Sequence, residues 1–183
     1  GTPVDCVKLA VNKILKRKPD LCVSGINHGS NSSINVIYSG TMSAALEGSL
    51  QGIPSIGFSL LDYAHDANFS TSQEVVRKLV TYVLKEGFPE GICLNVNIPK
   101  LPLKDIKGIR VSRQANANWI EEFDERKDPA GRTYYWLTGT FQNHDKREDT
   151  DEWALANRYV SVVPVQYDVT AHNVIPILNK WVL

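Results

Sequence analysis

Helix-like and strand-like segments alternate along residues 1–99, and few folds are compatible with this order. Apolar residues recur at helical spacing in three segments, 1–18, 42–50 and 71–87. Short apolar runs typical of strands follow them, at 21–24, 55–60 and 92–99. Such an alternation is typical of a parallel sheet with helices on both faces. We therefore predict an α/β fold with a Rossmann-like, doubly wound and mostly parallel sheet.

The first predicted helix spans residues 1–18. Thr2 is a candidate N-cap, Pro3 suits the first helical position, and Asp5 lies in the first turn, where the helix dipole favours a negative charge. Lys16-Arg17-Lys18 is expected to close the C-terminal end. The segment 21–24 that follows is predicted to be a short buried strand.

The other two predicted helices carry similar signals. Gly52 is expected to stop the second helix, whereas Thr71 and Glu74 form a capping box that opens the third and Gly87 ends it. The positions expected to face the core are Met42, Ala45, Leu46 and Leu50 in the second helix, and Val75, Val76, Leu79, Val80, Val83 and Leu84 in the third.

The sequence changes character after Pro99. A short strand is predicted at 109–112, and residues 113–152 are polar and rich in turn formers. The turn signal Asp128-Pro129-Ala130-Gly131 precedes the β-prone aromatic segment 133–137. We therefore predict a protruding β-hairpin arm outside the main sheet.

Three further expectations concern the C-terminal part. The charged run 144–149 is expected to be exposed to solvent. A last strand is predicted at 159–165, and Pro164 places it at an edge or near an end. Residues 174–183 are expected to form a short helix that docks Trp181. We treat 1–183 as one domain, with a core at 1–112, the arm at 113–152, and a C-terminal strand and tail at 153–183.

Composition excludes some functions. Lys plus Arg and Asp plus Glu balance at 20 each, so the chain has no overall positive field for binding a nucleic-acid duplex. The longest apolar runs are far shorter than the roughly 20 residues of a membrane-spanning helix. Cys6, Cys22 and Cys93 are far apart and lie in apolar patterns, so each is expected to be a small buried hydrophobe in a reducing compartment. We therefore favour a cytoplasmic location.

Residues 19–61 carry the strongest functional pattern. A short apolar run enters Ser24-Gly25-Ile26-Asn27, a loop rich in Gly, Ser and Asn follows, and Ser39-Gly40-Thr41 opens a helical segment. The first backbone N–H groups of a helix have no partner inside the helix, and its dipole attracts anions. This arrangement predicts a loop that binds phosphate.

These motifs resemble the SurE family of metal-dependent nucleotidases, which hydrolyse phosphate monoesters of nucleosides. The matching segments run in order along nearly the whole chain: Gly1–Val7, Pro19–Leu21, Ser24–Gly29, Tyr38–Thr41, Glu47-Gly48, Gly52–Ile56, Leu94–Pro99, Tyr134–Trp136, Thr150-Asp151 and Tyr159–Pro164. This combination is much more specific than any single glycine motif.

The resemblance implies roles for individual residues. Asn27 is expected to be a ligand of Mg²⁺ or Mn²⁺ through its side-chain oxygen. Ser39, Gly40 and Thr41 are expected to receive the phosphate of a nucleoside monophosphate through hydroxyl and backbone N–H groups, and Asn31 is a further phosphate-binding candidate. The family also exchanges arms and C-terminal segments between subunits, so a homodimer or homotetramer is expected.

The catalytic residues are expected elsewhere. Members of the family begin with a strand that ends in an Asp-Asp pair, and a serine further on completes their metal site. Both precede the segment that matches Gly1–Val7, so the resemblance places the Asp pair upstream of Gly1. We therefore expect the chain to begin partway through its domain and to be inactive alone.

The residues by themselves leave other interpretations open. Asn27 could be a turn asparagine bonded to its own backbone, and Ser39-Gly40-Thr41 an ordinary helix cap. The aromatic segment Tyr134–Trp136 favours packing or a subunit contact over base stacking. The alternative function is a non-catalytic nucleotide-binding or regulatory protein with the same fold. A dinucleotide-binding domain is disfavoured, because no GxGxxG follows a strand.

Overall fold

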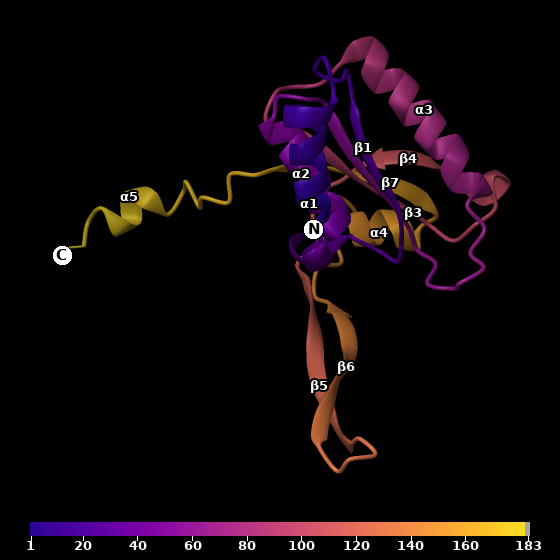
Figure 1. Cartoon of the computed structure of the whole chain (residues 1–183), viewed down its shortest axis with the longest axis vertical. Coiled ribbons are helices and arrows are strands. Elements are labelled where there is room, and N and C mark those ends of the chain that lie inside the picture. Colours follow the sequence, from indigo (N-terminus) through magenta and orange to yellow (C-terminus); the bar gives the residue numbers. More distant parts are fainter. Residues whose placement is uncertain (182–183) are drawn as a thin grey trace.

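A mixed five-stranded sheet forms the centre of the computed structural model, which describes residues 1–181 (Figure 1). The strand order is β1-β2-β3-β7-β4. Its strands are β1 (Cys22–His28), β2 (Ser55–Leu60), β3 (Ile92–Ile98), β4 (Gly108–Val111) and β7 (Tyr159–Gln166). Strands β1, β2 and β3 are parallel, β7 is antiparallel to β3, and β4 is parallel to β7. The predicted mostly parallel sheet is confirmed.

Helices cover both faces of this sheet (Figure 1). The helices are α1 (Pro3–Leu9), α2 (Gly40–Leu50), α3 (Ser70–Glu86), α4 (Asp151–Ala156) and α5 (Ile175–Leu178). Helix α2 packs on β1, β2 and β3 and contacts α1, whereas α3 lies on the opposite face and α4 packs against β7. A π-helical turn (Ala10–Ile14) and 3₁₀ turns at Ser33–Tyr38 and Leu103–Asp105 complete the regular structure. The doubly wound arrangement is therefore also confirmed.

The two faces of β2 explain how closely the helices pack. Ile56, Phe58 and Leu60 join the large apolar cluster under α3. On the other face, Gly57 lies under Met42 of α2, because a β-carbon at Gly57 would collide with the Met42 sulfur. Small residues on this face therefore let α2 approach β2 directly.

We predict that Gly57→Val lowers the free energy of unfolding by about 1–3 kcal/mol, because the new side chain must displace Met42. Met42→Ala should itself cost about 2–5 kcal/mol through the cavity it opens. In the double variant valine can enter that space, so the combined cost in urea unfolding should be smaller than the sum. Strictly additive costs would show that Met42 does not limit the space at Gly57.

The predicted hairpin arm is present. Strands β5 (Ala117–Lys127) and β6 (Thr133–Asn143) form a separate two-stranded antiparallel sheet that projects away from the body (Figure 1). Asp128 closes the turn between them, because its side chain accepts hydrogen bonds from the N–H groups of Ala130 and Arg132.

The first helix is shorter than predicted. Thr2 and Asp5 do form reciprocal capping bonds. The helix α1 ends at Leu9, however, and the π-helical turn that follows ends at Ile14, so the expectation of a helix to residue 18 is wrong. Ile14 and Leu15 are 65% and 47% exposed and gain little burial that would extend the helix. Arg17 pairs with Asp20 at 2.8 Å instead of capping the helix.

The predicted capping box of α3 is also wrong. The helix begins at Ser70, and the Thr71 hydroxyl donates to the carbonyl of Leu101 at 2.9 Å instead of capping the helix. Glu74 lies at the exposed surface and pairs with Arg77. Gly87 ends α3 as expected.

Several apolar side chains expected in the core are exposed. Leu50 and Leu84 lie in the last turns of α2 and α3 and are 53% and 55% exposed. Val23 is 48% exposed because β1 is the outer strand of the described sheet and the helices cover it only in part. The strand predicted at 21–24 is thus neither fully buried nor complete, since it continues to His28.

Cys93 is buried, which raises the pKa of its thiol to about 12. Cys22 is half-buried and Cys6 is exposed, so the expectation that all the cysteines are buried is wrong. Along residues 1–181, no helix combines the length and the apolarity that crossing a membrane requires.

The C-terminal part follows the predictions only in part. Pro164 lies inside β7 and pairs with Leu94 of β3, and β7 lies between β3 and β4, so the expectation of an edge strand or a strand end is wrong. The proline fits there because β4 pairs only as far as Val162. The tail then leaves the body, and α5 lies apart from the sheet (Figure 1). Trp181 is 62% exposed and does not dock on its own chain, contrary to the prediction. Residues 182 and 183 of that predicted helix lie outside the described part.

Candidate functional site

Asn27 follows an irregularity near the carboxyl end of β1. The pairing register between β1 and β2 shifts between Ser24 and Asn27. Gly25 permits this shift, because its φ is +114° and a β-carbon there would collide with the carbonyl oxygen of Phe58. The irregularity therefore determines how the Asn27 side chain leaves the strand.

The Asn27 amide uses its nitrogen for local bonds. Nδ2 donates to the carbonyl groups of His28 and Gly29, each at 3.0 Å. Within residues 1–181, no group donates to its Oδ1. The local bonding that the sequence allowed is therefore present, and it leaves free the oxygen atom that a hard metal ion would bind.

Asn31 is buried in a network of amides. Its N–H donates to Oδ1 of Asn97 at 2.8 Å, and its Nδ2 donates to Oγ of Ser59 at 2.7 Å. Its carbonyl oxygen accepts from Nδ2 of Asn95 at 2.8 Å. These bonds hold the loop after β1 on the ends of β2 and β3. Asn31 therefore positions the loop, and its role in phosphate binding stays a prediction.

Ser39 caps α2. Its Oγ accepts from the N–H of Met42 at 3.0 Å, as an ordinary N-cap does. In the described part of the chain, the N–H groups of Gly40 and Thr41 have no partner. A β-carbon on Gly40 would lie 3.3 Å from Cγ of Pro3, so the start of α1 lies beside the start of α2. Two free donors thus lie at the positive end of a helix dipole.

The two candidate groups share one edge of the sheet. Helix α2 connects β1 to the parallel strand β2 and packs on both, so its N-terminus lies at the carboxyl end of β1, where Asn27 is found. Among the described residues, no hydrogen bond joins Asn27 to residues 39–41. The structure brings them to the same edge of the sheet without a direct hydrogen bond between them.

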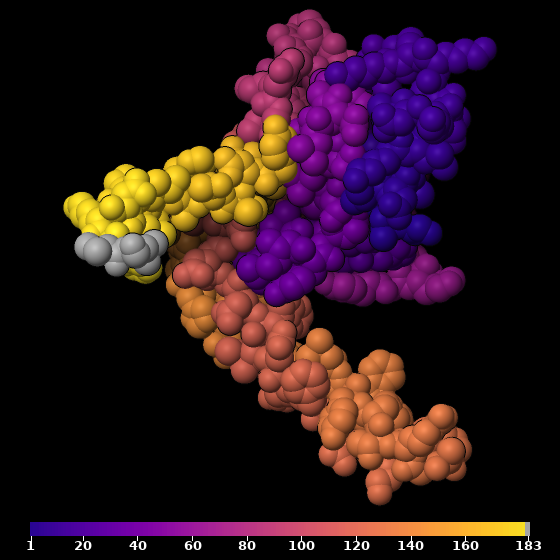
Figure 2. Space-filling model, turned by 60° about the vertical axis from the view of Figure 1, so that its left-hand side comes forward, coloured from indigo at the N-terminus to yellow at the C-terminus, as the bar shows by residue number. Residues whose placement is uncertain are grey.

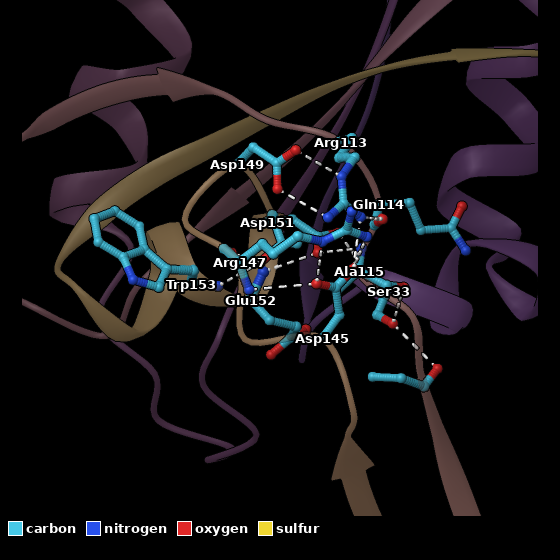
Figure 3. Close-up of polar contacts among 12 residues, drawn as sticks. Ser33, Arg113, Gln114, Ala115, Asp145, Arg147, Asp149, Asp151, Glu152 and Trp153 are labelled. Atoms are coloured by element: carbon cyan, nitrogen blue, oxygen red, sulfur yellow. Dashed lines mark hydrogen bonds and ion pairs between the residues drawn. The ribbon is translucent and has the colours of Figure 1, made fainter.

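Asp151 lies in the segment Thr150-Asp151, to which the sequence assigned no separate role. It is buried at the start of α4, behind the N-cap Thr150. Its carboxylate accepts from the N–H groups of Ser33 at 2.7 Å and Ala115 at 2.9 Å (Figure 3). Burial raises the pKa of Asp151, although these donors oppose the rise. Asp151 therefore ties the loop before α2 to the base of the arm, and the sequence signalled it only through the Thr150-Asp151 motif.

Comparison with known proteins identifies the family of this chain. The family described as "Survival protein SurE" matches residues 1–121. The chain belongs to the SurE family. The 5'-nucleotidase SurE of Flavobacterium psychrophilum is 66% identical over 99% of this chain and 70% of its own length. The protein of the same name from Flavobacterium johnsoniae is 64% identical over 100% and 71%.

A solved structure agrees as well. The crystal structure of the SurE protein from Aquifex aeolicus superposes with a TM-score of 0.83 at 43% identity, and the match covers 98% of this chain and 72% of that one. The expected family and fold are therefore confirmed.

In this SurE family member, Arg113 forms ion pairs with acidic side chains at the base of the arm (Figure 3). Its guanidinium donates to Asp145 at 2.7 Å and to both oxygens of Asp149 at 2.8 Å. Arg147 also donates to Asp145 at 2.9 Å, and the Asp145 side chain is only 5% exposed. The expectation that the run 144–149 is exposed to solvent is therefore wrong at Asp145, because arginines on both sides allow its burial.

We predict that acid weakens this cluster. Hydrogen bonds from Arg147 and Arg113 hold the pKa of Asp145 well below its usual range. Asp145 therefore contributes stability above its unfolded pKa of about 3.9 and loses it as the pH falls toward the folded value. Asp145→Asn should be less stable than the parent at neutral pH, and urea unfolding should show this deficit shrinking below roughly pH 4. A pH-independent deficit would contradict the charge argument. Asp66→Asn, on an exposed loop, is the matched control.

Proposed function

We propose that the protein is a metal-dependent phosphomonoesterase that hydrolyses nucleoside monophosphates, a 5'/3'-nucleotidase. The enzyme class rests on relatives that carry the name 5'-nucleotidase at up to 66% identity. One observation carries the proposal for the site. At the start of α2, Gly40 and Thr41 present free N–H groups at the same edge of the sheet as Asn27.

In this proposal the start of α2 receives the substrate phosphate. The N–H groups of Gly40 and Thr41 donate to its oxygens, and the helix dipole favours its negative charge. The Ser39 hydroxyl accepts from Met42, so its own hydrogen is still free to be donated to the phosphate. Because α2 holds these donors in place, they also stabilise the charge that develops during hydrolysis.

The residues present fit one ligand position of a divalent metal. Oδ1 of Asn27 has the hard-oxygen chemistry of Mg²⁺ and Mn²⁺ sites. Among residues 1–181, no group of three or more His, Cys, Asp or Glu side chains could hold an ion. The proposal therefore assigns the charged ligands and the catalytic carboxylate to the Asp pair that the family pattern places before Gly1. When bound, such an ion would neutralise phosphate charge and lower the barrier to attack.

Pro3, at the start of α1, lies against Gly40 and so beside the proposed phosphate position.

We expect Asn27→Ala in the full-length encoded protein to lower phosphate release from AMP by at least about ten-fold, because even indirect partners of a metal contribute this much. The Mg²⁺ or Mn²⁺ concentration at half-maximal rate should rise as well. Asn12→Ala, which removes an exposed amide that donates to the carbonyl of Lys8, is the control. If Asn27→Ala leaves the rate and the metal dependence unchanged, Asn27 is not a ligand. AMP binding without hydrolysis by the parent would favour the non-catalytic alternative.

We also propose a homodimer or homotetramer in the cytoplasm. Aromatic side chains on the arm are largely exposed: Tyr135 and Trp136 are 60% and 54% exposed. Trp181 on the tail is similarly exposed at 62%. Large aromatic side chains exposed on a projecting arm and on the tail favour a contact with another protein chain. The free cysteines support a reducing compartment.

Light scattering at micromolar concentration should therefore give two or four times the chain mass. The double variant Tyr135→Lys/Trp136→Lys should reduce this mass, because two buried charges would oppose the contact. Tyr82→Lys, at an equally exposed aromatic on α3, should leave it unchanged. A monomeric parent would contradict the proposal.

A further inference from the structure

A cavity of about 500 Å³ separates the segment that leads into α2 from the base of the arm. Its walls are formed by Tyr38, Trp119, Glu121, Leu137, Thr138 and Gly139. The space-filling view shows the arm leaving the body beside the segment that precedes α2 (Figure 2). The cavity thus lies next to the proposed phosphate position, and its walls are mainly apolar and aromatic.

Two aromatic rings are available in this cavity. Tyr38 immediately precedes the helix cap Ser39 and is 74% exposed. Trp119 is 42% exposed, and its Nε1 donates to Oδ1 of Asn35 at 2.9 Å. The Trp119 ring also meets that of Phe141 at 5.4 Å between centroids. The indole is therefore held in one orientation while part of its surface is free.

The hairpin register keeps space beside the indole. Trp119 pairs with Phe141, and Glu121 pairs with Gly139, so these four positions share one face of the arm. Gly139 has a φ of +156°, and a β-carbon there would collide with the backbone of Ile120. The backbone thus requires glycine at this point, and no side chain fills the floor of the cavity.

The position of Tyr38 connects the cavity to the phosphate site. Tyr38 forms one wall of the cavity and directly precedes Ser39. Adjacent Cα atoms are about 3.8 Å apart, so this aromatic wall begins one residue before the proposed phosphate-binding residues. In a nucleoside monophosphate the ribose joins the phosphate to the base, and a phosphate at the start of α2 would leave the base close to this wall. The Glu121 carboxylate would repel a phosphate from the cavity and favour this orientation.

We propose that this cavity is the subsite for the nucleobase, with Tyr38 and Trp119 stacking on the base. The proposal rests on the proposed function, since it assumes a phosphate at residues 39–41. Stacking on aromatic rings tolerates every base, because each base has a π-face. The enzyme should therefore discriminate weakly among bases but strongly favour nucleotides over a sugar phosphate without a base.

The test uses the full-length protein with AMP, CMP and ribose 5-phosphate. Trp119→Ala and Tyr38→Ala should each raise KM for AMP and CMP by about ten-fold or more, the effect of losing one stacking partner. Hydrolysis of ribose 5-phosphate should not change. Tyr82→Ala, at an exposed aromatic on α3, should leave all three substrates unaffected. Tyr38 lies outside the arm, so its variant still tests the subsite if Trp119→Ala disturbs folding.

Adenosine binding separates the two proposals. Saturation-transfer NMR should detect adenosine on the parent and a weaker signal on Trp119→Ala. If this occurs while AMP is not hydrolysed, the subsite stands and the proposed function fails. The subsite is overturned if KM for AMP is unchanged, if ribose 5-phosphate loses activity equally, or if Trp119→Ala changes only the oligomeric mass. The last result would assign the cavity to a second copy of the chain.

Discussion

The close packing of α2 on β2 is the constraint on which the candidate site depends. Met42 lies directly over Gly57, and a β-carbon on Gly48 would lie 2.9 Å from Cβ of Cys22. Such an approach is possible only where β-carbons are missing. Because α2 is a rigid helix, the packing of its middle residues on the sheet also fixes the position of its first turn. The free donors at the start of α2 are therefore set at the edge of the sheet by packing several residues away from them.

The loop between β1 and α2 is held with comparable precision by polar contacts. Buried amides without partners would be costly, and here Asn31, Asn95 and Asn97 satisfy one another and the Ser59 hydroxyl. The carboxylate of Asp151 then binds the loop from the other side. This part of the chain therefore acts as a fixed spacer between the metal-ligand candidate and the proposed phosphate-binding turn.

Local signals in the sequence predicted most of the framework. The strands predicted at 55–60 and 92–99 agree with the structure nearly to the residue, because in each apolar residues alternate with small or polar ones next to a flanking Gly or Pro. Predictions failed where a distant partner overrides a local preference. Thr71 has the spacing of a helix cap, but its hydroxyl bonds Leu101, which is 30 residues away. Burial of Leu84 could not be judged from helical spacing either, since spacing does not say where the sheet ends.

The charged contacts at the base of the arm were unpredictable for the same reason. Asp145 bonds Arg113 across 32 residues, and Asp151 bonds Ser33 across 118. Nothing in the run around Asp145 distinguishes a paired acid from a solvated one. These long-range hydrogen bonds nevertheless determine how the arm is placed, because they fix its base against the loop that leads into α2. Trp119 and the proposed phosphate-binding turn are therefore held by one connected set of contacts, and a change at the base of the arm should affect both.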